Sequence, residues 1–466
     1  MEAEGRIIFS DNLNNKKEIF EPEKRVPVLM NVDVAIVGGG VAGIAAAIAA
    51  AREGAKTVLI ERDGCLGGTA TVGMMCVFQG ADFSVVRGIF YELVERLKEQ
   101  QGIVLGSNAC HAPFDPEIFK FVSEQMVLES GSKILYHTYF SKVIVRDKVV
   151  EGIIVETEGR RCAILAKNTI DTSGNADVIA SVNAPFEKNE YVQPVSLVFR
   201  MDHIDLMKLV EYIKTNPDQF YSAPGQRTWL IDQDPPFFTV GGFFGLIKYA
   251  KSKKELYLPH ESIWLGVLPR KGELFINATR VVGVDGLNCI DLTKAIIDTR
   301  KQMWSVAKFL IRYVPGFKEA QIVDSGVRIG VRETRRAIGE YMLTKDDLLT
   351  GKRFSDAIAN YNFPMDVHSP KGKEEGHGWT LVPTSYDIPF RSLIPKNYKR
   401  LLVGGRCIST DHEAHGSTRS MPCCMATGQA AGVAAAIAAN KGIAIRDIDI
   451  RELRNALLKQ NVLLKE

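Results

Sequence analysis

The sequence predicts an α/β fold in which a parallel sheet is interrupted by a second region of mixed α+β structure. Two observations support this prediction. The apolar run 34–37 is followed by closely spaced glycines and a small-residue helix, and a similar strand, glycine pair and small-residue helix follow Leu401. The length of 466 residues allows two to four structural units. We therefore expect one discontinuous domain with another inserted into it.

The N-terminal unit carries the glycine pattern of a dinucleotide-binding turn. Gly38, Gly40 and Gly43 form GxGxxG directly after the predicted strand. Their expected roles are a tight turn, a close approach to a pyrophosphate and close helix packing. The next strand ends in Glu61, and an acidic side chain there accepts hydrogen bonds from a ribose hydroxyl. A packing helix without a ligand is the alternative, but packing alone does not require Glu61.

A second glycine turn follows Glu61 directly and favours FAD over NAD. The stretch RDGCLGGTATVGMM contains Gly67, Gly68 and Thr69, and a second phosphate-contacting turn suits the longer FAD molecule. The region resembles the N-terminal FAD motif of the flavoproteins related to fumarate reductase and glutathione reductase, which include many FAD-dependent oxidoreductases.

Three more stretches resemble the same flavoproteins. Residues 133–178 predict a strand, a three-stranded meander and a final strand ending at a TSG turn, residues 326–349 form an Arg-rich segment, and residues 401–439 resemble a closing FAD motif. The resemblance implies a Rossmann-like FAD-binding domain with a β-meander at 31–188 and 386–466. A mixed α+β cap is expected at 189–385, with 325–350 able to return to the flavin, after an N-terminal arm at 1–30. Further implied cofactor contacts are Arg62, Phe140, Gly174, Gly405, Arg406, Ser420 and Met421.

The closing motif explains why a polar loop runs into a helix of Ala, Gly and Val. The resemblance implies that the loop 410–421 lies beside the isoalloxazine and that the helix from about Pro422 points its N-terminus at the N1/C2=O edge. Arg406 stands where many relatives have an aspartate that holds the ribityl chain. Relatives with covalent flavin use a histidine after the second glycine turn, and residues 67–80 contain none. We expect noncovalent FAD.

Candidate catalytic residues are His412 and Arg419 in this loop. An imidazole titrates near neutral pH and suits acid/base work, and a guanidinium suits an anion or the flavin O2. The alternative for each is a hydrogen bond that orders the loop. His415 is a weaker candidate, and a metal at the pair His412 and His415 is not expected because no second ligand pair is evident.

The Arg-rich segment offers an anion site. As a strand it would put Arg328, Arg332 and Arg336 on one face, and as a helix it would cluster Arg328, Arg332 and Arg335. We name Arg332 and Arg336 as candidate catalytic contacts to an anionic substrate. The alternative is a surface strand paired with Glu333 and Glu340. His368 is a candidate contribution from the cap.

Other features limit the function. No second strand, GxGxxG and helix unit is present, so a dedicated NAD(P)H domain is not expected, and Val240 to Gly245 is interpreted as a bend between strands. The eight cysteines lack CxxC spacing, which predicts reduced thiols, and the adjacent Cys423 and Cys424 are interpreted as packing residues rather than a thiol relay. Basic and acidic residues, 58 and 55, are well mixed. We therefore expect neither a nucleic-acid nor a membrane partner.

These observations predict a cytoplasmic FAD-dependent oxidoreductase. It would transfer a hydride between flavin N5 and a small metabolite, anionic if the arginines bind it. The alternative is a flavin-binding subunit, or a modification or assembly factor, that does not act alone on a small molecule. The sequence does not specify the external electron donor or acceptor or the oligomeric state.

Overall fold

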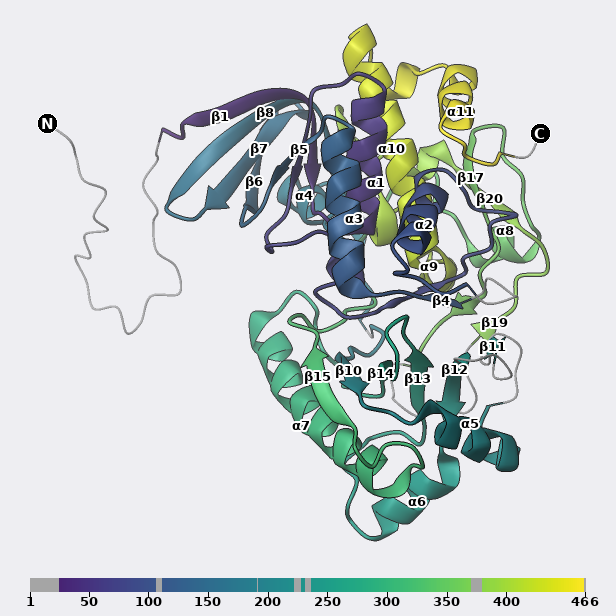
Figure 1. Cartoon of the computed structure of the whole chain (residues 1–466). Coiled ribbons are helices and arrows are strands. Elements are labelled where there is room, and N and C mark those ends of the chain that lie inside the picture. Colours follow the sequence, from purple (N-terminus) through teal and green to yellow (C-terminus); the bar gives the residue numbers. More distant parts are fainter. Residues whose placement is uncertain are drawn as a thin grey trace, which may run out of the picture.

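A seven-stranded sheet forms the upper half of the molecule in Figure 1, in the order β5-β2-β1-β8-β7-β6, with β21 also paired to β8. The computed structural model describes residues 25–105, 111–190, 192–221, 228–230, 236–369 and 379–464. β1, β2, β5, β8 and β21 pair in parallel, whereas β6, β7 and β8 form an antiparallel meander. The strands are β1 (Val28–Val37), β2 (Thr57–Ile60), β5 (Lys133–Leu135), β6 (Tyr139–Arg146), β7 (Val149–Thr157), β8 (Arg160–Asp171) and β21 (Leu401–Val403). This arrangement confirms the predicted Rossmann-like fold with a β-meander.

One detail of this sheet differs from the prediction. The third meander strand and the final strand are a single twelve-residue strand, β8. Its first half pairs with β7, its last three residues pair with β21, and β1 runs along its other edge. The third strand of the meander therefore continues, without the break we expected, as the strand that ends at the TSG turn. β1 also begins earlier than predicted, at Val28, and most of the expected N-terminal arm, residues 1–24, lies outside the described residues.

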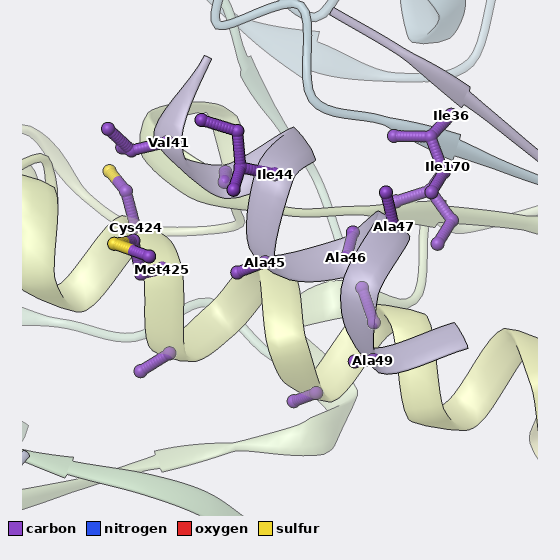
Figure 2. Packing of buried hydrophobic residues seen from close by; sticks show 14 of the residues in the cluster. Ile36, Val41, Ile44, Ala45, Ala46, Ala47, Ala49, Ile170, Cys424 and Met425 are labelled. Carbon is purple, nitrogen blue, oxygen red and sulfur yellow. The ribbon is translucent and has the colours of Figure 1, made fainter. Parts of the chain in front are cut away.

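Two small-residue helices pack together on this sheet. α1 (Val41–Arg52) and α10 (Met421–Lys441) approach so closely that a Cβ on Gly428 would lie 2.1 Å from the Ala42 carbonyl oxygen. Figure 2 shows α1 alanines against α10, with Cys424 and Met425 near Val41. Among the described residues, α10 is the one helix long and apolar enough to span a membrane, but its apolar window is entirely buried in this core. The other helices around the sheet are α2 (Ile89–Glu99), α3 (Pro116–Glu129), α4 (Asp177–Ser181) and α11 (Ile450–Lys459).

A second, six-stranded sheet forms the lower half of Figure 1, in the order β11-β12-β13-β14-β10-β15. The long amphipathic helix α7 (Cys289–Tyr313) buries one face against it. The glycines of Val240 to Gly245 end β12 and lead directly into α6, so our interpretation of this stretch as a bend between strands is wrong. The elements are β10 (Val198–Asp202), β11 (Thr228–Leu230), β12 (Phe237–Gly242), β13 (Ile263–Val267), β14 (Leu274–Asn277), β15 (Gln321–Ser325), α5 (Leu206–Thr215) and α6 (Phe244–Ser252).

The remaining strands of the described residues form four short pairs. The pairs are β3 (Val77–Gln79) with β4 (His111–Pro113), β9 (Phe186–Glu187) with β16 (Arg336–Ala337), β17 (Ala357–Tyr361) with β20 (Tyr386–Pro389), and β18 (Met365–Asp366) with β19 (Trp379–Thr380). α8 (Lys345–Leu349) and α9 (His412–Thr418) complete the helices of the described residues. The division into two domains at the predicted boundaries stays a prediction.

Candidate functional site

In the first glycine turn, Gly38 and Gly43 have no room for a side chain, whereas Gly40 has room for one. Gly38 has φ +103°, and a Cβ there would lie 2.7 Å from the Thr172 carbonyl oxygen. A Cβ on Gly43 would lie 1.9 Å from the Gly38 carbonyl oxygen. A Cβ on Gly40, in contrast, would meet nothing within 4 Å, and Gly40 caps α1 without a side-chain hydrogen bond. This open space at a helix N-terminus fits a phosphate group.

The second glycine turn lies directly against the first. The Gly67 amide donates to the Gly39 carbonyl at 2.9 Å, and a Cβ on Gly68 would lie 3.2 Å from the Gly40 Cα. Thr69 follows in a short 3-10 helix and is exposed. The structure therefore brings the two predicted phosphate-contacting turns together around Gly40.

Glu61 lies at the end of β2, close to the same turns. Its Oε2 accepts from the Gly39 amide at 2.7 Å and its Oε1 accepts from the Asp63 amide at 2.9 Å. Each carboxylate oxygen keeps further acceptor capacity for a ribose hydroxyl. The Thr138 amide donates to the Glu61 carbonyl, and Phe140 lies half-buried in β6 two residues further on. Arg62 is exposed. Their cofactor contacts stay predictions.

The ends of β8 and β21 meet on the other side of the glycine turns. The Thr172 hydroxyl lies 2.9 Å from the carbonyl oxygens of both Val37 and Gly38. The Gly405 amide donates to the Thr427 hydroxyl of α10 at 3.0 Å. Arg406 donates to the Gly174 carbonyl at 2.6 Å, to the Asn175 side chain at 2.7 Å and to the Val331 carbonyl. Its guanidinium therefore ties three segments together, and its predicted contact with the cofactor stays a prediction.

The segment that precedes α10 is a helix rather than the loop we predicted. The Asp411 side chain accepts from the Ala414 amide at 2.7 Å and caps α9, which begins at His412. At 3.6 residues per turn, His412, His415 and Arg419 lie on one face of this short helix and its C-cap. α10 then begins at Met421 with Pro422 in its first turn, close to the predicted start. Ser420 is its N-cap residue, and the Ser420 hydroxyl contacts the Tyr361 hydroxyl at 2.6 Å.

His412 is held by a buried carboxylate. Its Nδ1 lies 2.9 Å from Glu333 Oε1, and also 2.7 Å from the side-chain nitrogen of Asn189. Burial alone would raise the pKa of Glu333, but hydrogen bonding to His412 and the nearby charge of Arg336 hold it below its ordinary value. Nδ1 donates to the Glu333 carboxylate when it carries the proton and accepts from the Asn189 amide when it does not, so both contacts hold the ring with Nδ1 turned inward.

Arg336 contributes to this arrangement from inside the protein. It is only 1% exposed and donates to Glu333, to the Thr410 carbonyl at 3.0 Å, and to Glu187 and Asn189. All three of its nitrogens have protein partners. Arg336 is therefore a positioning residue that acts through Glu333. Its predicted contact with the substrate stays a prediction.

The Arg-rich segment is neither the strand nor the helix that we expected over its length. Its residues are irregular except for β16 and, at the end of the segment, α8, and its arginines go to separate partners. Arg328 pairs with Asp63 at 2.9 Å, Arg332 donates to the Pro194 carbonyl at 2.6 Å and the Ser196 hydroxyl at 2.8 Å, and Arg335 pairs with Asp177. The segment connects the two sheets, and these guanidinium groups do not converge on one anion site.

Arg419 is fixed by a carboxylate that sequence analysis missed. Its NH2 group donates to the Asp366 carboxylate at 3.0 Å and to the Asp366 carbonyl at 2.8 Å. Burial would raise the pKa of Asp366, but the charges of His368, Arg419 and Arg332 hold it well below its ordinary value. His368 Nε2 lies 3.4 Å from the same carboxylate. The only sequence signal for Asp366 was its place two residues before His368.

Several buried polar atoms around α9 have no hydrogen-bond partner in the described part of the chain. They are Ser409 Oγ, Thr410 Oγ1, His415 Nδ1 and Arg419 Nε. Buried polar groups are normally paired, so four orphaned atoms within eleven residues indicate a place for a polar molecule.

The same region holds buried thiols but no metal cluster. Seven cysteines lie in the described residues and all are free thiols. Burial raises the pKa of Cys424 to about 12, which disfavours a thiol relay there. No group of three metal-ligating side chains occurs within the ranges that the structure describes.

A family model described as FAD dependent oxidoreductase matches residues 33–457. The chain belongs to this family. FAD is therefore its cofactor, and this oxidoreductase is an enzyme, as the sequence predicts. The glycine turns, Glu61 and the start of α10 are the residues that we predict to hold FAD.

Individual relatives are more distant. The thiamine thiazole synthase of Methanococcus vannielii is 27% identical over 176 residues, which are 34% of this chain and 63% of that protein. That of Saccharolobus islandicus is 29% identical over 163 residues, 33% of this chain and 58% of that protein. The chain thus spans less than two thirds of the length of these relatives.

Solved structures cover more of the chain at low identity. A geranylgeranyl bacteriochlorophyll reductase-like protein from Thermoplasma acidophilum is 13% identical with a TM-score of 0.49, over 93% of this chain and 84% of that chain. The p-nitrophenol 4-monooxygenase of Pseudomonas putida is 9% identical with a TM-score of 0.48, over 93% and 85%.

Proposed function

We propose that this oxidoreductase transfers a hydride between N5 of FAD and a small anionic metabolite that lies along one face of α9. The supporting observation is the group of orphaned buried polar atoms between Ser409 and Arg419. Bound FAD supplies the two-electron chemistry, and the protein has to place the substrate and manage its charge and its proton.

Arg419 is the proposed anchor for the anion. Asp366 fixes one end of the guanidinium, while Nε is buried without a partner in the described residues. A carboxylate or similar group of the substrate would satisfy this N–H and gain a charge-assisted hydrogen bond. The buried acid orients Arg419 in advance, so little side-chain entropy is lost on binding.

His412 is the proposed acid/base group. Glu333 binds Nδ1, and Arg336 in turn holds Glu333, so the ring orientation is fixed from inside the protein. His412 and Arg419 are seven residues apart, which corresponds to a rise of about 10 Å along a helix. The substrate would extend over roughly this distance and pass the buried His415. Burial and the charges of Arg336 and Arg419 hold the pKa of His415 well below its ordinary value. His415 is therefore neutral and can offer a hydrogen bond without charge.

The test uses the FAD-loaded enzyme under anaerobic conditions. Small hydroxy acids and dicarboxylates are added one at a time, and bleaching or a shift of the flavin absorbance is recorded. We expect Arg419→Gln to weaken the response by about 100-fold, since a charge-assisted hydrogen bond is worth roughly 1.5–3 kcal/mol. The matched control is Arg446→Gln, because Arg446 pairs with Glu340 outside this site.

Two outcomes would contradict the proposal. One is that no anion in the series perturbs the flavin, and the other is that Arg419→Gln responds as the wild type does. For His412, the His412→Asn variant should lower kcat with little change in KM, whereas a merely structural histidine would leave kcat unchanged. The alternative function, a flavin-bound subunit or assembly factor, stays an open prediction.

A further inference from the structure

The outward face of α7 carries a regular row of large apolar side chains. Ile290, Ile297, Trp304 and Ile311 are 61%, 52%, 58% and 37% exposed. They are spaced seven residues apart, so on a straight helix each lies about 20° from the previous one and they form a row on one side of α7, with the exposed Lys294, Lys301 and Lys308 on the turns between them. Over three heptads this stripe is about 30 Å long. We call it the α7 stripe.

The opposite face of α7 accounts for the stability of the helix. Met303, Val306 and Leu310 are buried against the six-stranded sheet, and Ala295 is buried in a small separate cluster. In Figure 1, α7 lies along the outer side of that half of the molecule. The α7 stripe therefore adds nothing to the core among the described residues, and several large exposed apolar side chains on one side of a helix indicate an interaction site.

The charges beside the stripe have one sign. The exposed charged side chains of α7 are Lys294, Arg300, Lys301, Lys308 and Arg312. Of these, Arg312 pairs with Glu255 at 3.1 Å, and the other four have no ion-pair partner in the described ranges. The two acids of α7 are half-buried, and Asp298 accepts hydrogen bonds from Tyr257 at 2.9 Å and Gln302 at 2.8 Å. The outward face thus presents apolar and basic groups without acids.

This charge pattern disfavours a second copy of the chain. Two α7 stripes packed together would bring the basic rows of both copies close to each other, with no exposed acid on either helix to pair them. The complementary partner is negatively charged and accepts a straight apolar ridge. We propose that α7 docks this oxidoreductase onto an anionic lipid surface.

The side chains of α7 suit such a surface. Helices that lie in a membrane interface combine an apolar face containing Trp or Ile with flanking Lys and Arg. Trp304 would lie at the headgroup level, and the lysine stems would extend along the acyl boundary with their ammonium groups among the lipid phosphates. The whole-chain charge balance led us to expect no membrane partner. That balance hides the basic face, because only the folded helix collects these residues on one side.

The test is binding of the FAD-loaded enzyme to vesicles in a sedimentation assay. We expect binding to vesicles of phosphatidylcholine mixed with phosphatidylglycerol, loss of that binding at high salt, and little binding to phosphatidylcholine alone. The triple variant K294Q/K301Q/K308Q should bind about 100-fold more weakly, and Trp304→Ser about 10-fold more weakly. The control is Met207→Ser, since Met207 is 60% exposed on α5. FAD content and melting temperature show whether each variant is folded.

Three results would overturn the inference. The first is no binding of the folded wild type to anionic vesicles at low salt. The second is binding that neither variant weakens. The third is a dimer in lipid-free buffer that Trp304→Ser abolishes, which would assign the stripe to a second copy.

Discussion

Replacing Gly40 by alanine should weaken FAD binding while leaving the fold intact. An added Cβ at Gly40 meets no atom within 4 Å, and the backbone there has φ −66°, which alanine adopts without strain. The stability of the apoprotein should therefore change by less than about 0.5 kcal/mol. In the holoenzyme the methyl group would occupy space next to the phosphates. Overpacking of this kind costs about 1–3 kcal/mol, which corresponds to a 5- to 150-fold weaker affinity.

Gly428→Ala is the informative comparison. A Cβ at Gly428 would lie 2.1 Å from the Ala42 carbonyl oxygen, so α1 and α10 would have to separate. This variant should lower the melting temperature of apoprotein and holoenzyme alike. The assay is a thermal scan of both variants without FAD, followed by fluorescence titration of the apoproteins with FAD. The reasoning fails if Gly40→Ala binds FAD as tightly as wild type, or if its apoprotein is as unstable as that of Gly428→Ala.

Three further predictions concern Glu333, His111 and the attachment of FAD. Glu333→Gln should destabilise the protein by about 3–5 kcal/mol in chemical denaturation, because it removes the buried counter-charge of Arg336; an unchanged midpoint would contradict this pair. Burial lowers the pKa of His111 to about 4. The free energy of unfolding should therefore keep its full value above pH 6.5 and fall by up to about 3 kcal/mol as the pH decreases towards 4, because the unfolded chain binds the proton more tightly. His111→Phe should remove this part of the acid sensitivity, and an unchanged pH profile would refute the assignment. Heat precipitation should release intact FAD into the supernatant, and flavin that stays with the pellet would argue for a covalent bond.

The sequence predicted the cofactor end of the molecule well because its signals are local. A glycine that needs a positive φ or a close contact is visible from its neighbours, and Gly38, Gly43 and Glu61 follow one another within one strand, helix and strand. The second turn at Gly67 was predictable for the same reason. Its contact with Gly40 also follows from the chain order, since both turns lie at the same edge of a parallel sheet.

The catalytic end was less predictable because its contacts join distant segments. Glu333 reaches His412 across 79 residues and Asp366 reaches Arg419 across 53, and neither pairing has a sequence periodicity. The four arginines of the Arg-rich segment looked like one cluster, yet in an irregular chain each goes to its own partner. His415 was the weaker candidate in a predicted loop, whereas α9 buries it where the charges of Arg336 and Arg419 help to hold its pKa well below its ordinary value.

The contact between α1 and α10 also bears on how the protein is made. Ala42 and Gly428 touch although about 390 residues separate them. At a synthesis rate of about 5–20 residues per second, α1 would wait roughly 20–80 s for the helix that covers it. During that time its alanine face and the edge of β8 that β21 later covers are open to water and to other chains. The core of the six-stranded sheet lies within residues 197–325 and can form before α10 is made, while the predicted FAD site is completed last.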